Sequence, residues 1–92
     1  MRELELQLTQ FVVENFLFGK TNGFKSSDSF LEKGIIDSTG MVELIFHLEN
    51  SYGIKIEDSE LVPDNLDSVE RVAAFVERKQ AAARAESIIH AS

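Results

Sequence analysis

The stretch that decides the fold lies at residues 34–44 and reads Gly-Ile-Ile-Asp-Ser-Thr-Gly-Met-Val-Glu-Leu. Its first part is typical of a loop that approaches a helix. Asp37 is a favourable N-cap residue, because its short side chain can accept hydrogen bonds from the free amide groups of a first helical turn. The stretch therefore predicts a helix that starts at Ser38, and Gly53 predicts its end near Tyr52.

The predicted helix over 38–52 is apolar on two sides. Helical spacing separates a large apolar stripe from a smaller one that lies beside acidic residues. A helix of this kind in a small domain either lies between neighbouring elements or exposes one side to a partner. The large stripe consists of Met41, Leu44, Ile45, Leu48 and Tyr52, and the smaller one of Val42 and Phe46 with Glu43 and Glu49.

The segments before this helix predict one further helix and a long loop. Apolar residues at helical spacing over 4–17 indicate an amphipathic helix, which Gly19 ends. Residues 20–37 contain glycines and a polar cluster and are too long for a tight turn. We expect an ordered loop there, anchored by its apolar side chains, which are Phe30, Leu31, Ile35 and Ile36.

The segments after it predict two more helices. A short acidic turn of helix is expected near residues 57–62, ended by Pro63. The last helix should begin after Asp67 as its N-cap, with Glu70 completing a capping box. Val69, Val72, Ala73 and Val76 would face inward. The fold class is thus an all-α four-helix bundle with a long first loop and a short third helix. Residues 1–79 would form the domain and residues 80–92 a helical extension that frays, anchored only by Ile88 and Ile89.

Composition bounds the function. The 92 residues suffice for one domain, and the absence of cysteine means that any thiol chemistry needs an imported thiol. The net charge is −7, and residues 34–70 hold nine acids against one base, Lys55. Such a field repels nucleic acid and anionic membranes and attracts basic protein surfaces, although the acids could equally serve solubility alone. With neither a signal peptide nor a membrane-spanning run expected, the sequence favours a cytoplasmic monomer.

Ser38 is the candidate for chemistry. It lies where loop and helix meet, and a phosphate ester there would face unpaired amide groups and the positive end of the helix dipole. Because Asp37 is the better cap, the Ser38 hydroxyl is free to point outward. The alternative is that Asp37 and Ser38 are only a capping pair, and the physical argument by itself favours that alternative.

The pattern resembles the signature of acyl and peptidyl (aminoacyl) carrier proteins. The resemblance rests on Asp37-Ser38, Val42-Glu43-Leu44, Leu48-Glu49 and Tyr52-Gly53-Ile54, and it extends over residues 11–79. It implies that Ser38, preceded by Asp37, carries 4′-phosphopantetheine, whose terminal thiol would hold cargo as a thioester. It also implies no catalysis by the chain itself. The implied partners are a phosphopantetheinyl transferase, an adenylating ligase or acyltransferase, and downstream acyl-processing enzymes. The positions implied to meet them are Thr39, Val42, Glu43, Phe46 and Glu49.

Two positions depart from the pattern of fatty-acid carriers. Thr39 follows the serine where a large apolar residue is usual, and Gly40 replaces an acid. The Ser-x-Gly arrangement looks more like D-alanyl carrier proteins and other discrete carriers. Glycine in a first helical turn costs about 1 kcal/mol against alanine, so we expect it to allow close approach of the arm or a partner. A harmless substitution is the alternative.

Other readings have weaker support. His47 and His90 have no matching cysteine or carboxylate spacing, so we expect surface histidines and no metal site. Ser38 lacks a nucleophile elbow, and the acids after position 57 do not match a calcium loop. Phe46 could pack against the long loop instead of a partner. The rival function is an unmodified acidic helical interaction module, and an enzyme comes third because no acid–base pair is visible.

Overall fold

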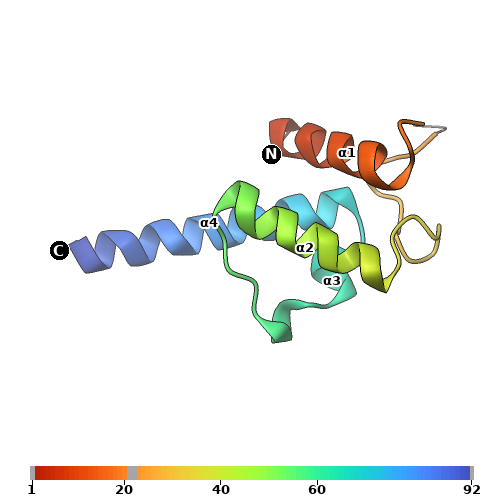
Figure 1. The fold of residues 1–92 in the computed structure, drawn as a ribbon. Helices are drawn as coiled ribbons and strands as arrows, with labels where there is room; N and C mark the ends of the chain where they lie inside the picture. Colours follow the sequence, from red (N-terminus) through yellow and green to blue (C-terminus); the bar gives the residue numbers. More distant parts are fainter. Residues whose placement is uncertain (1, 21–22, 92) are drawn as a thin grey trace.

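The protein is all-helical in the computed structural model, which describes residues 2–20 and 23–91 (Figure 1). The elements follow in the order α1 (Arg2–Phe16), α2 (Ser38–Tyr52), the short 3-10 helix η1 (Asp58–Glu60), α3 (Pro63–Leu66) and α4 (Val69–Ala91). No strand occurs among the described residues. This confirms the predicted all-α fold class with its long first loop. The turn of helix expected near residues 57–62 is the 3-10 helix η1, and the short helix α3 follows it.

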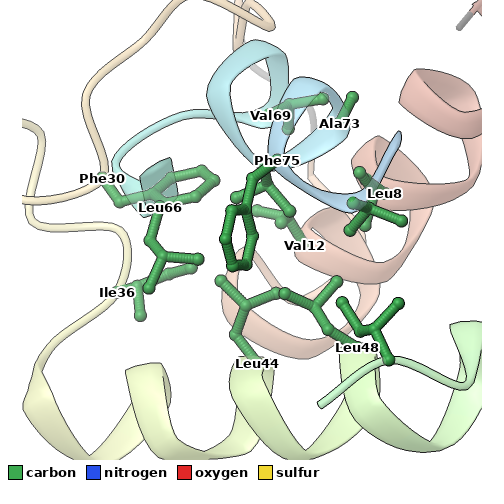
Figure 2. Close-up of a cluster of buried hydrophobic side chains, with 13 residues drawn as sticks. Leu8, Val12, Phe30, Ile36, Leu44, Leu48, Leu66, Val69, Ala73 and Phe75 are labelled. Atoms are coloured by element: carbon green, nitrogen blue, oxygen red, sulfur yellow. The ribbon is translucent and has the colours of Figure 1, made fainter. Parts of the chain in front are cut away.

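Helix α4 organises the packing, because its first half makes the main contacts with α1, α2 and α3. Figure 2 shows Phe75 of α4 in one buried cluster with side chains of α1 and α2. Leu44 and Leu48 of α2 are almost fully buried, as are Leu8 and Val12 of α1. The four residues of α4 expected to face inward are all buried, which confirms that stripe: Val69, Val72, Ala73 and Val76.

The first loop is held down by the junction of α3 and α4. Phe30 is fully buried, and its amide donates to the Asp67 carbonyl at 2.9 Å. The Asp67 carboxylate accepts from the Leu31 amide at 3.0 Å and from the Ser29 hydroxyl. Ile36 is buried as expected, whereas the prediction for Leu31 was wrong because its side chain is 58% exposed.

Two predicted caps were wrong for a shared reason. The N-cap of α4 is Ser68, whose hydroxyl accepts from the Arg71 amide at 3.1 Å, because the loop already occupies the Asp67 carboxylate. Glu70 accordingly contacts the loop, accepting from the Ser26 hydroxyl at 3.1 Å.

Pro63 begins α3 and does not end a helix, since proline fits a first helical turn where no amide partner is needed.

Helix α4 continues beyond the bundle and carries the C-terminal end away from the other helices (Figure 1). The helix runs as far as Ala91. The side chains of residues 81–85 are exposed. The expected anchors Ile88 and Ile89, and His90 with them, lie outside the residues whose side chains are described. None of the helices in 2–20 and 23–91 is both long and apolar enough to cross a membrane.

Candidate functional site

Ser38 is the first residue of α2 and its side chain is exposed. The capping role falls to Asp37, whose backbone is extended and whose Oδ1 accepts from the Gly40 amide at 2.7 Å. The Asp37 carbonyl accepts from the Met41 amide at 2.8 Å and so starts the regular helical pattern. Asp37 therefore caps the first turn, as expected, and Ser38 is exposed beside it.

The electrostatics of this turn suit an anion attached to Ser38. Helix geometry leaves the amide groups of the first turn without helical partners, and Asp37 takes up the one on Gly40. The amides of Ser38 and Thr39 remain at the positive end of a 15-residue helix. A phosphate on the Ser38 hydroxyl would thus lie in a favourable field.

The presence of glycine at position 40 is explained by packing that the sequence did not reveal. The residue is buried, and a Cβ built there would lie 2.7 Å from Phe16 Cε1 and 3.1 Å from Ile36 Cγ2. We expected close approach by the arm or a partner, but the group that approaches is the ring of Phe16 at the end of α1. The glycine therefore fixes the Ser38 turn against α1 through direct packing.

An apolar hollow of about 210 Å³ adjoins Ser38. It lies between the start of α2 and the segment that contains α3, and most of its wall is hydrophobic. The sequence did not predict this hollow. The apolar residues around Pro63 form its wall only once the segment that carries them is packed beside the start of α2. We call it the Ser38 hollow, and its lining is Leu31, Asp37, Ser38, Met41, Leu61, Val62, Pro63, Leu66 and Asp67.

The smaller apolar stripe of α2 faces outward. Val42 is 65% exposed and Phe46 is 67% exposed, so the alternative that Phe46 packs against the first loop is wrong. Thr39 and Glu43 on the same side are exposed as well. Beside them lies a shallow depression between α1 and α2, to which Phe11 also contributes.

Glu49 differs from the other acids on this helix. It is half-buried, and its Oε2 accepts from the Ile56 amide at 2.9 Å. The carboxylate therefore ties the segment after α2 back to the helix. Of the residues expected to meet partners, Thr39, Val42, Glu43 and Phe46 share exposure on α2, whereas Glu49 has a structural contact.

His47 lies in the wall of the shallow depression between α1 and α2, where it is half-buried. Its ring stacks on Phe11 with centroids 3.8 Å apart and an interplanar angle of 10°. Partial burial lowers the pKa of His47 below its ordinary value of 6.5, since the charged imidazolium loses hydration. No cluster of three or more metal-ligating side chains occurs in the part of the chain that the structure describes.

Comparison with known proteins bears on this geometry. No family model matches the sequence. D-alanyl carrier proteins of Streptococcus pyogenes serotypes M5 (strain Manfredo), M49 (strain NZ131) and M1 are 32% identical to the chain over 77 residues. These matches cover 82% of this chain and 98% of each relative.

Among solved structures, a chain in a crystal structure of an FAD-dependent dehydrogenase superposes with a TM-score of 0.68 at 32% identity. That match covers 75% of this chain and 97% of the other. The signature around Ser38, the helical fold with its long first loop and the similarity over most of both chains agree. This chain belongs to the acyl and peptidyl (aminoacyl) carrier protein family.

Proposed function

We propose that the protein carries an acyl or aminoacyl group as a thioester on 4′-phosphopantetheine attached to Ser38, and that it performs no catalysis of its own. The observation that carries the proposal is the exposed Ser38 at the start of α2, freed from capping by Asp37. A serine needed for the fold would be buried or would cap its own helix.

The residues around Ser38 fit the proposed group. The arm would be joined through a phosphodiester to the Ser38 hydroxyl, where the amides of Ser38 and Thr39 favour negative charge. When bound, the arm supplies a thiol, which a chain without cysteine lacks. The Ser38 hollow offers apolar surface next to the attachment atom, so the chain can shelter part of the arm or its cargo.

The size of this hollow favours a short cargo. At about 210 Å³ it is smaller than the pockets of several hundred Å³ that hold drug-sized ligands. The related proteins named D-alanyl carrier proteins point the same way. We propose a small amino acid as the cargo class, loaded by an adenylating ligase.

The similarity to a chain in the structure of an FAD-dependent dehydrogenase adds an oxidising flavoenzyme as a candidate downstream partner.

The outward side of α2 would meet these enzymes. Val42 and Phe46 provide exposed apolar surface, and Glu43 provides charge at its edge. Apolar residues near the centre of an interface carry most of the affinity, whereas charges at the rim mainly raise the association rate. This arrangement suits a carrier that must bind several enzymes in turn and leave each of them quickly.

The test is intact-mass measurement after incubation with a phosphopantetheinyl transferase and coenzyme A. Wild-type protein should gain the mass of one arm, and Ser38→Ala should gain none while it melts at nearly the same temperature. Ser59→Ala is the matched control, because it removes an exposed hydroxyl away from the start of α2 and should leave modification intact. A wild-type protein that gains no mass would support the unmodified interaction module, and a modified Ser38→Ala would place the arm elsewhere.

A further inference from the structure

The turn after α1 holds a strained residue. The amides of Leu17 and Gly19 both donate to the Val13 carbonyl, and the Lys20 amide donates to the Leu17 carbonyl at 2.9 Å. Phe18 and Gly19, the two central residues of this last turn, have φ values of 53° and 81°. Positive φ at both central positions is typical of turns that favour Asn-Gly or Gly-Gly pairs.

Phenylalanine is an unusual choice at the first of these positions. A side chain with a Cβ loses free energy in the left-handed region relative to glycine. Burial does not offset this loss, because Phe18 is 88% exposed and has the largest exposed fraction among the large hydrophobic side chains of the described residues. Phe18 therefore adds nothing visible to the stability of the fold, and strain combined with exposure is a feature of functional sites.

A hollow lies beside Phe18, so the exposed ring and the hollow together form an irregular surface. Its volume is about 330 Å³, and its apolar walls come from Phe16, Leu17, Phe24 and Ile35. Lys20 and Lys33 also line it, together with Asp28, whose carboxylate is already engaged by the Lys25 amide. We call this hollow with Phe18, Lys20 and Lys33 the Phe18 corner.

The charge of this region is opposite to that of the rest of the molecule. Residues 17–35 contain three lysines and two acids, whereas the remainder of the chain contains six bases and fourteen acids. A partner that the acidic side of α2 attracts would be basic. The Phe18 corner therefore fits a different surface, one that is acidic around an apolar centre.

The corner adjoins the site of modification. Phe16 forms part of its wall, and the same ring lies against Gly40 in the first turn of α2. Ile35, also in the wall, is three residues before Ser38. An enzyme that reaches Ser38 can thus cover the corner in the same encounter.

We propose that the Phe18 corner is a second docking surface for an enzyme that works at Ser38. The enzyme would receive the Phe18 ring in an apolar pocket, insert an apolar side chain into the hollow, and place carboxylates near Lys20 and Lys33. The inference rests on the proposed function of Ser38. A protein fits the Phe18 corner better than a lipid surface does. The hollow beside the protruding ring can be filled by a complementary protein surface, whereas a flat membrane would leave it empty.

The experiment uses full-length protein with two purified enzymes: the phosphopantetheinyl transferase with coenzyme A, and the adenylating ligase with ATP and its amino acid. Phe18→Ala and the double variant Lys20→Glu/Lys33→Glu should raise KM for at least one enzyme about tenfold with kcat nearly unchanged. Leu6→Ala and Lys55→Glu are matched controls, because both residues are exposed and lie outside the corner. They should stay within about twofold of wild type.

A second variant separates docking from folding. Phe18→Gly relieves the left-handed strain, so it should raise the melting temperature by a few degrees while still raising KM. Unchanged KM for both enzymes in Phe18→Ala would overturn the inference alone. Phe18-dependent binding to phosphatidylglycerol vesicles, or Phe18-dependent self-association in sedimentation, would also overturn it. Failure of wild-type protein to accept the arm would overturn the proposed function together with this inference.

Discussion

The two sides of α2 carry similar side chains in opposite environments. Leu44 and Leu48 are at most 1% exposed, whereas Val42 and Phe46 on the same helix are about two-thirds exposed. The inward side gains free energy by packing against α1 and α4. The outward side gains nothing comparable within the domain. Folding alone therefore does not explain its apolar residues, and the proposed encounters with partner enzymes are a second source of the apolar pattern.

The largest expected effect tests this contrast directly. Leu44→Ala should lower the free energy of unfolding by about 2–5 kcal/mol, because it opens a cavity in the core. Phe46→Ala should lower it by less than about 1 kcal/mol, since little buried surface is lost, yet it should slow transfer of cargo to a downstream enzyme. Urea unfolding of both variants provides the measurement. A loss of stability in Phe46→Ala comparable to that in Leu44→Ala would mean that the two sides do not differ.

A second change tests the first turn of α2, where Gly40 packs against α1. Gly40→Ala should destabilise the protein by about 1–3 kcal/mol, because its Cβ would lie 2.7 Å from the Phe16 ring. Combining it with Phe16→Leu should cost less than the two single losses added together. Thr39→Ala in the same turn is the control and should be nearly neutral. Thermal unfolding of the four variants would settle the point, and additive losses would show that the contact is not the cause.

The acids of α2 provide a sharper version of the comparison. Glu43→Lys should leave stability unchanged but reduce the rate of loading several-fold at low salt, with the difference shrinking as salt rises. Glu49→Lys should lower stability by about 1–2 kcal/mol, because the Ile56 amide loses its acceptor. Loading kinetics and chemical unfolding of the same two variants are the measurements. Equal behaviour of the two variants in both assays would contradict the assignment.

The smallest expected effect concerns His47, which lies between the two sides. Burial lowers its pKa in the folded state, so the unfolded state binds more protons as the pH falls. Its contribution to stability is present above about pH 6.5 and is lost as the pH falls through the lowered pKa of the folded state. His47→Gln should flatten the dependence of stability on pH in that window. Glu60, whose pKa is lowered mainly by the Glu57 amide, titrates at more acidic pH and leaves the window clear.

Local signals were enough to predict the Ser38 turn. Asp37 at the N-cap and Gly53 at the left-handed C-cap are decided by their immediate neighbours, and both lie where the sequence placed them. The signature around Ser38 likewise identified the family. Features that depend on distant partners were missed or misjudged. Asp67 was expected to cap α4, but the first loop occupies its carboxylate, and no pattern near position 67 reveals a loop more than thirty residues upstream.

Gly40 and the Phe18 corner illustrate the same limit. The glycine was expected to allow close approach of the arm or a partner, but the ring that lies against it belongs to α1, 24 residues earlier. Phe18 has no signal of its own in the sequence, because a phenylalanine near the end of a helix is usually buried. Its strain and exposure become visible only when the backbone after α1 has been placed.

The attachment of the first loop to Asp67 has a consequence for motion. The Phe30 and Leu31 amides both depend on Asp67, one through its carbonyl and the other through its carboxylate. If Asp67 moves out of its position, both amides are exposed at once, together with the short helix α3 that ends beside it. Hydrogen exchange in the loop should therefore follow a single opening shared with the α3–α4 junction, with Leu31 leaving the wall of the Ser38 hollow during the same event.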